Sequence, residues 1–164
     1  MARNILVVGE LDGSTINSTT EELLGAASRL ADGGQVSVTL LGSGAAEAGA
    51  GAFAAGAGRV FAGGDAAFDE FRPDQWVAAV ESALDGASPD VVLIAQSMVG
   101  RDLGPRLAFR RNTAVAMDCL RVEDDGGTLK ATRSAYGGNA QAMELAVADY
   151  CQMMLCLNEF VFVD

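Results

Sequence analysis

Few side chains in this chain could act as nucleophiles, general bases or metal ligands. The 164 residues contain no histidine, which excludes a Ser-His-Asp triad, a Cys-His dyad and every His-ligated metal site. Lys130 is the only lysine, and it follows Leu129 rather than a glycine, which excludes a phosphate-binding Gly-x-x-x-x-Gly-Lys loop. We therefore expect no catalytic constellation in this chain, and we expect that it is not an enzyme.

The three cysteines, Cys119, Cys151 and Cys156, lack the paired short spacing of a zinc site. We interpret them as reduced thiols that fill the core, and the cytoplasm as the location of the chain. The sequence shows no secretory signal and no membrane span. The net charge of -11, with 11 basic residues in all, disfavours nucleic acid and anionic membranes as partners.

Glycines follow the first two apolar runs, but without the spacing of a dinucleotide fingerprint. After Gly42-Ser43-Gly44 the third glycine would be needed where Glu47 stands, and the first run ends in Gly9-Glu10 without the pattern. An ATP site of the universal-stress type starts with two glycines three residues apart, and no such pair occurs. A nucleotide, if one binds, would lie near residues 9–12 and 96–100, where parallel strands end.

The most informative segment is a strand that runs into a helix. Residues 91–95 are an unbroken apolar run, typical of a buried parallel strand, and residues 100–108 read Gly-Arg-Asp-Leu-Gly-Pro-Arg-Leu-Ala. Gly100 permits the turn, Asp102 is expected to cap the helix, and Pro105 is expected near its start. Arg101 and Arg106 are then either part of a capped helix with a surface ion pair or groups that orient a loop at a subunit interface.

A second group of candidate residues follows at 133–140, which read Arg-Ser-Ala-Tyr-Gly-Gly-Asn-Ala. We favour a structural role here, in which Gly137, Gly138 and Asn139 form a bend or bulge between strands. A buried guanidinium needs a partner, so we predict that a carboxylate holds Arg133, with Asp118 or Asp102 as candidates. Tyr136 belongs to the same motif.

These two ordered motifs resemble those of the alpha subunit of electron transfer flavoproteins, namely Gly-Arg-Asp-Leu-x-Pro-Arg-Leu-Ala and Arg-x-x-Tyr-Gly/Ala-Gly-Asn-Ala. The opening run at residues 5–10 and the helix expected at residues 20–30 also fit that family, so the resemblance covers nearly all of the chain. It implies that Gly100, Arg101, Asp102, Arg106, Arg133, Tyr136, Gly137, Gly138 and Asn139 shape structure or an interface, and that none of them is catalytic.

The resemblance also implies what this chain does not hold. In the family a second domain carries most contacts to FAD, and the related beta subunit binds AMP. No flavin-binding residue can therefore be assigned here, and we expect no cofactor in this chain. The expected role is a scaffold for subunit assembly in flavin-based electron transfer, with a beta-type subunit as partner.

Apolar runs and helical patterns alternate along the chain, which predicts a three-layer α/β fold with an open, mostly parallel sheet. The resemblance implies that this sheet is Rossmann-like and of the adenine nucleotide alpha hydrolase-like type. One domain is expected over residues 1–164. Strands are predicted at residues 4–8, 36–41, 59–62, 90–95 and 114–117, and helices at 18–30, 45–55, 73–84 and 101–111. Residues 65–71 are expected to form an irregular loop.

An antiparallel extension is predicted after residue 118, with strands at residues 120–122, 129–132, 143–147, 152–157 and 159–163. Residues 123–127 are expected to form a hairpin turn, because Asp and Gly tolerate positive φ angles.

A rival hypothesis from another class is a stand-alone nucleotide or small-molecule binding or sensor domain of universal-stress-like fold. In that case the apolar run at residues 151–157 could lie on an edge strand and pair with a second copy, so that a homodimer replaces the beta-type partner.

Overall fold

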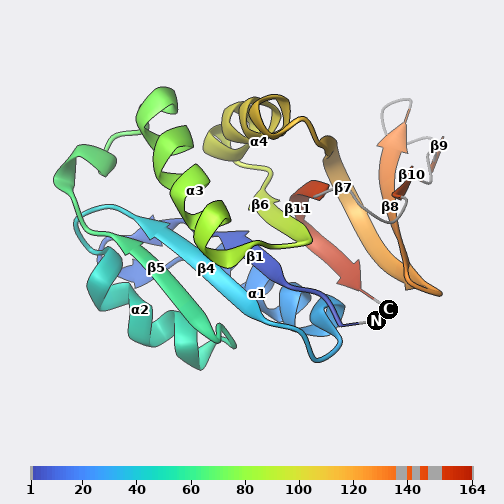
Figure 1. Cartoon of the computed structure of the whole chain (residues 1–164), viewed down its shortest axis with the longest axis horizontal. Coiled ribbons are helices and arrows are strands. Elements are labelled where there is room, and N and C mark those ends of the chain that lie inside the picture. Colours follow the sequence, from blue (N-terminus) through green and yellow to red (C-terminus); the bar gives the residue numbers. More distant parts are fainter. Residues whose placement is uncertain (1, 136–139, 142–144, 148–152, 164) are drawn as a thin grey trace.

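The computed structural model describes residues 2–135, 140–141, 145–147 and 153–163, with side chains over residues 2–133. Within this part, nine strands form one sheet in the order β10-β8-β7-β11-β6-β1-β4-β5, and β9 pairs with β8 beside that path (Figure 1). In chain order the strands are β1 (Ile5–Val8), β4 (Val36–Leu41), β5 (Arg59–Gly63), β6 (Val91–Ala95), β7 (Ala114–Asp125), β8 (Thr128–Ala135), β9 (Ala140–Gln141), β10 (Leu145–Val147) and β11 (Met153–Val163).

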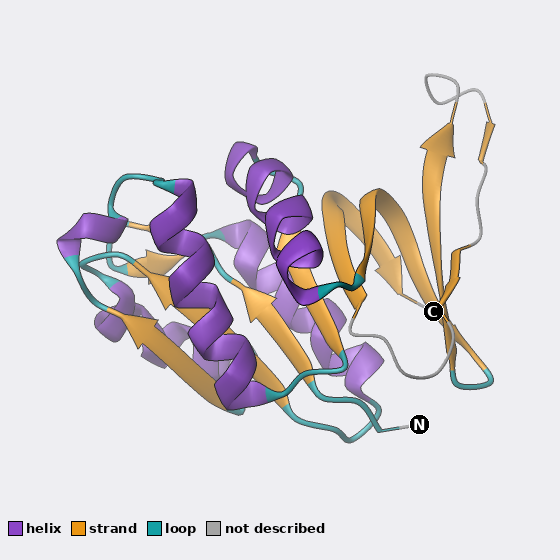
Figure 2. Ribbon diagram, turned by 45° about the horizontal axis from the view of Figure 1, so that its top comes forward, coloured by secondary structure: helices purple, strands orange, loops and turns teal. Residues whose placement is uncertain are grey.

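Helices cover both faces of this sheet, which confirms the three-layer α/β prediction (Figure 2). One core cluster joins α1 and α2 to one face, and a second joins α3 and α4 to the other. The helices are α1 (Ser18–Ala31), α2 (Ala45–Ala54), α3 (Pro73–Ala87) and α4 (Met98–Arg111). Each lies where the sequence predicts a helix.

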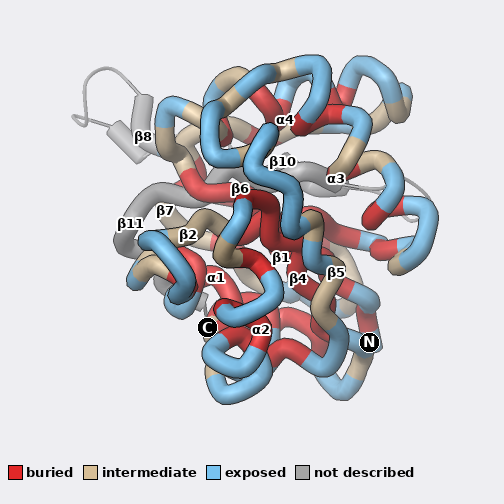
Figure 3. Tube along the Cα trace, turned by 90° about the vertical axis from the view of Figure 1, so that its left-hand side faces the viewer, coloured by how far each residue is buried: buried red, intermediate tan, exposed pale blue. Residues whose placement is uncertain are grey.

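The central strand β1 shows why the sheet needs two helical layers. Ile5 and Val7 belong to the cluster under α1 and α2, while Leu6 and Val8 belong to the cluster under α3 and α4. Side chains alternate between the faces of a strand, so an unbroken apolar run can be buried only when both faces are covered. All four residues are at most 2% exposed. Red segments occupy the middle of the molecule in Figure 3.

The sheet changes from parallel to antiparallel along its order. β5, β4, β1, β6, β11 and β7 pair in parallel, whereas β8 pairs antiparallel with β7 and with β10. The hairpin between β7 and β8 turns on Gly126 and Gly127 alone, whose φ angles are 63° and 99°. Residues 123–125, predicted to lie in the turn, belong to β7 because the two glycines already satisfy a two-residue hairpin.

The last strand lies inside the sheet and pairs in parallel with both of its neighbours, which corrects the edge-strand hypothesis and the prediction that this segment belongs to the antiparallel extension. Residues 153–157 of β11 are paired with β6 on one side and with β7 on the other. Their backbone groups are therefore already bonded, and they offer no unpaired edge to a second copy. β7 and β11 also run unbroken over residues 114–125 and 153–163, where two shorter strands were predicted for each.

Two short features were not predicted. β2 (Leu11–Asp12) and β3 (Thr15–Ile16) form a small hairpin after β1, and the 3-10 helix η1 (Ala66–Phe68) lies within the expected irregular loop. Both are too short to leave a periodic hydrophobic pattern in the sequence.

Helix α4 begins earlier than its sequence suggested. Its N-cap is Ser97, whose hydroxyl accepts a hydrogen bond of 3.0 Å from the backbone N–H of Gly100. The prediction that Asp102 caps the helix was wrong, because the serine immediately after β6 already provides a capping oxygen. Asp102 lies in the second turn and accepts a hydrogen bond from Arg106 instead.

The earlier start also changes the position of Pro105. It is an interior residue of α4 rather than one of the first turn, as was predicted. Proline has no N–H, so the carbonyl of Arg101 receives no helical bond from it. The buried side chains of Leu103 and Leu107, on the other side of the helix, hold this weakened turn against the sheet.

The prediction that Gly100 permits a turn was wrong, because Gly100 lies inside α4. A close approach of backbone to backbone requires the glycine there. A Cβ at this position would overlap the carbonyl oxygen of Ala95 at the end of β6. We expect Gly100→Ala to lower the free energy of unfolding by about 1 to 3 kcal/mol, because the junction must move to admit the methyl group. Gly25→Ala, in α1, is the matched control, since a Cβ there meets only the end of Arg29 at 3.7 Å.

The control should be neutral or stabilising by up to about 1 kcal/mol, since alanine is the better helix former. Urea unfolding of both variants measures the difference. Equal stability of Gly100→Ala and Gly25→Ala would contradict the close approach.

The amino-terminal segment is tied to the far hairpin by a largely buried arginine. Arg3 is 8% exposed, pairs with the carboxylate of Asp124 and donates to the carbonyl of Gly127 at 2.7 Å. The hydrogen bond from Arg3 is the main cause that holds the pKa of Asp124 below its ordinary value, against the opposing effect of burial. This pair connects two segments of the chain that are 121 residues apart in sequence.

The lowered pKa of Asp124 predicts a dependence of stability on acid. The folded state binds the proton of this carboxyl more weakly than the unfolded state, so its contribution is present near neutral pH and is lost as the pH falls through the folded pKa, below 3.8. We expect Asp124→Asn to cost about 1 kcal/mol near pH 7. The gap to wild type should close towards pH 3.

Urea titrations at several pH values measure this gap, with Asp12→Asn as control because the Asp12 carboxylate is exposed. A gap that stays constant between pH 7 and pH 3 would show that Arg3 does not act through this carboxylate.

Candidate functional site

A cleft of about 760 Å³ opens at the carboxyl ends of the parallel strands. Residues after β1 and β4 line it together with η1 and the starts of α2, α3 and α4. This is the place where open α/β sheets usually bind ligands, and it includes Glu10, Leu11 and Val99 from the two segments singled out for a nucleotide. Phe68, Phe71 and Trp76 are its large apolar lining residues.

The polar groups of this cleft are mostly acidic. Glu10, Glu47 and Asp69 line it, and no arginine or lysine is among its described lining residues. The carboxylate of Asp69 accepts a hydrogen bond of 2.7 Å from the backbone N–H of Ser43, ahead of α2. Glu10 accepts one from the hydroxyl of Ser97, ahead of α4.

These bonds determine which ligands the cleft can accept. A phosphate at such a site normally binds backbone N–H groups at a helix start. Here the backbone N–H of Ser43 already donates its hydrogen bond to Asp69. The negative charges of Glu10 and Glu47 would in addition repel a phosphate. The geometry therefore offers space at the usual position but the wrong charge for a nucleotide.

We predict that AMP does not bind this cleft. A site with a Kd of about 10 µM would stabilise the folded chain by about 2.7 kcal/mol at about 1 mM ligand. We expect no rise in melting temperature and no saturable change in the fluorescence of Trp76, the only tryptophan, which lines the cleft. Adenosine at the same concentration is the control that separates the base from the phosphate. A saturable response to AMP would overturn the charge argument.

The arginines of the first motif lie on the outer side of α4. Arg101 and Arg106 are exposed, and Arg106 donates from Nε to Asp102 at 3.1 Å, four residues earlier. The predicted surface ion pair is therefore present. The structure does not show whether these side chains orient a loop at an interface, and that reading stays a prediction.

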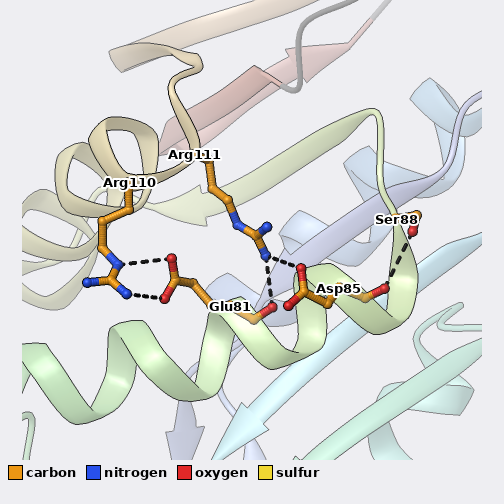
Figure 4. A network of polar contacts seen from close by, with 5 residues as sticks. All are labelled: Glu81, Asp85, Ser88, Arg110 and Arg111. Carbon is orange, nitrogen blue, oxygen red and sulfur yellow. Dashed lines mark hydrogen bonds and ion pairs between the residues drawn. The ribbon is translucent and has the colours of Figure 1, made fainter.

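A network that the sequence did not reveal fixes α4 to α3 (Figure 4). Arg110 makes two hydrogen bonds to the carboxylate of Glu81, at 2.9 and 2.7 Å, and Arg111 bonds Asp85 at 2.6 Å and the carbonyl of Glu81 at 3.0 Å. The hydrogen bond from Arg110 is the main reason that the pKa of Glu81 lies below its usual value. The one sequence signal for this network was the spacing of Glu81 and Asp85, which lie four residues apart on one face of a helix.

The second motif is described only in part. Arg133 is exposed and pairs with neither Asp118 nor Asp102, so the prediction of a carboxylate partner for a buried Arg133 was wrong. An exposed guanidinium is solvated by water and needs no such partner. Tyr136, Gly137, Gly138 and Asn139 lie outside the described residues, and their expected roles stay predictions. The strands on either side of them, β8 and β9, pair antiparallel.

The one cysteine side chain that lies within residues 2–133 is buried, and no metal-ligand cluster occurs there. Cys119 is buried, and burial raises the pKa of its thiol to about 11, which keeps it protonated as core filler as predicted. Cys151 lies outside the described residues, and the side chain of Cys156 is not described. No cluster of three or more Cys, Asp or Glu side chains suited to a metal occurs in the described part. None of its helices is both long and apolar enough to cross a membrane.

The fold and the site together define an open-sheet α/β domain with an antiparallel extension, an acidic cleft and a motif helix that presents arginines outwards. The model of the electron transfer flavoprotein domain matches residues 5–160, and the chain belongs to that family. The resemblance found in the two motifs is thereby confirmed.

Individual relatives agree with this assignment. The chain is 30% identical to Protein FixB of Clostridium saccharobutylicum, over 98% of this chain and 48% of that protein. It is 31% identical to the electron transfer flavoprotein subunit alpha of Megasphaera elsdenii, over 98% of this chain and 48% of that protein. The subunit alpha of Bacillus subtilis is 26% identical over 85% of this chain. The chain spans about half the length of the curated relatives it matches.

Proposed function

We propose that this chain is the amino-terminal domain of an alpha-type electron transfer flavoprotein subunit and serves as a scaffold for subunit assembly. The observation that carries the proposal is the family match over residues 5–160, which includes both motifs. Relatives named subunit alpha support an alpha-type role and an assembly with another subunit. The chain itself then contributes protein contacts to electron transfer and catalyses no reaction.

The proposal places the flavin outside this chain. FAD carries a pyrophosphate, which calls for N–H donors or basic side chains. The cleft at the carboxyl ends of the strands offers three carboxylates instead. The acidic cleft therefore does not fit FAD or AMP, and this misfit supports the proposal that FAD belongs to a second domain and AMP to a beta-type subunit. The cytoplasmic location expected from the sequence stays a prediction.

We predict that the chain purified alone is colourless and that it forms a one-to-one complex with the beta-type subunit encoded by the same organism. Absorption spectra from 350 to 500 nm, a range that covers the usual ~450 nm flavin band, test for flavin, since bound cofactor carries its own chemistry and colour. Light scattering on a sizing column measures the mass of the complex. Flavin that copurifies in stoichiometric amount with the isolated chain would contradict the proposal.

A small-molecule sensor remains the second candidate, and the volume of the cleft is the observation that favours it. The same sizing experiment separates the two. A chain that stays alone in the presence of the beta-type subunit, or that forms a homodimer, would favour the sensor.

A further inference from the structure

The outer side of α4 carries apolar side chains that the fold does not cover. Met98 is 91% exposed and Phe109 is 88% exposed, although both are large and apolar. They lie about three helical turns apart and therefore point to the same side of the helix. Exposed Pro105 lies between them along the same line.

Positive charge flanks this apolar line. Arg101 and Arg106 lie on either side of it, by their helical positions. The side chain of Arg101 pairs with no described residue, and among these residues Arg106 forms an ion pair with Asp102 alone. We call Met98, Arg101, Pro105, Arg106 and Phe109 the α4 ridge.

The ridge is unusual for this molecule. The chain has a net charge of -11 and 11 basic residues, yet α4 alone holds four of them, namely Arg101, Arg106, Arg110 and Arg111. Met, Phe and Arg are also the residue types enriched at protein interfaces. An exposed apolar line with flanking guanidinium groups has the composition of a docking surface.

The helix that carries the α4 ridge is fixed to the rest of the fold in the unbound chain. Arg110 and Arg111 bind Glu81 and Asp85 of α3, and Leu103 and Leu107 are fully buried on the inner side of the helix. A preformed surface loses little conformational entropy on binding.

We propose that the α4 ridge is the surface through which this chain binds its partner subunit, and that the partner supplies an apolar groove edged with carboxylates. This inference rests on the proposed function. Charge argues against a second copy as the occupant, because a two-fold contact between ridges would set the arginines of one copy against those of the other, with Asp102 as the only acidic residue of α4. A different, acidic surface satisfies Arg101.

The test measures binding of the full chain to the beta-type subunit of the same organism by calorimetry. We expect Phe109→Gln and Arg101→Glu each to raise the Kd about tenfold or more, and Arg101→Glu also to flatten the dependence of affinity on salt.

Phe53→Gln and Arg29→Glu are the controls. Phe53 is 54% exposed on α2 and Arg29 is exposed on α1, both across the sheet from α4. The controls should change the Kd less than about twofold, as expected for surface residues outside an interface.

Melting curves of all four variants check that each remains folded, which is expected because every substituted side chain is exposed. If wild type binds and the α4 variants bind equally well, the inference is wrong while the proposed function stands. If wild type does not bind the beta-type subunit at all, the proposed function fails and the inference fails with it. If the α4 variants instead abolish a homodimer, the occupant is a second copy and the inference is overturned.

Discussion

The contact between Gly100 and the carbonyl of Ala95 determines how α4 is placed against the sheet, and α4 carries the exposed ridge and part of the cleft wall. Because α4 starts directly against the end of β6, the chain has space there for a glycine backbone and no side chain. The same close start places Ser97 where its hydroxyl can both cap α4 and donate to Glu10. The direction of α4, its exposed ridge and one wall of the cleft all follow from this junction.

Charge is distributed unevenly over the two surfaces that the junction creates. At the carboxyl edge of the sheet, Glu10 and Asp69 bond the groups that a phosphate would need, which leaves an acidic cleft. On the outer side of α4 the excess is positive, although the whole chain is strongly acidic. The usual ligand position of the fold is therefore lined by carboxylates, while the outer side of α4 presents exposed apolar and basic side chains.

The chain belongs to the electron transfer flavoprotein family and spans about half the length of relatives named as alpha subunits. A domain with no reactive group in its described part can still contribute to electron transfer if it holds other parts in place. In this structure the two ion pairs between α3 and α4 fix the helix that carries the exposed motif.

The sequence by itself determined the order of strands and helices, because the unbroken apolar runs of β1 and β6 and the periodic faces of the helices are local patterns. It also determined the absence of histidine chemistry, whereas the need for a glycine at position 100 became visible only in the close approach of α4 to the carbonyl of Ala95. The sequence did not determine that β11 lies between β6 and β7, since an apolar run has the same composition inside a sheet and at its edge. Nor did it show that Ser97 rather than Asp102 caps α4, that Asp69 bonds Ser43, or that Arg133 stays exposed. These features depend on distances between segments far apart in the chain, which only the packing of the tertiary structure decides.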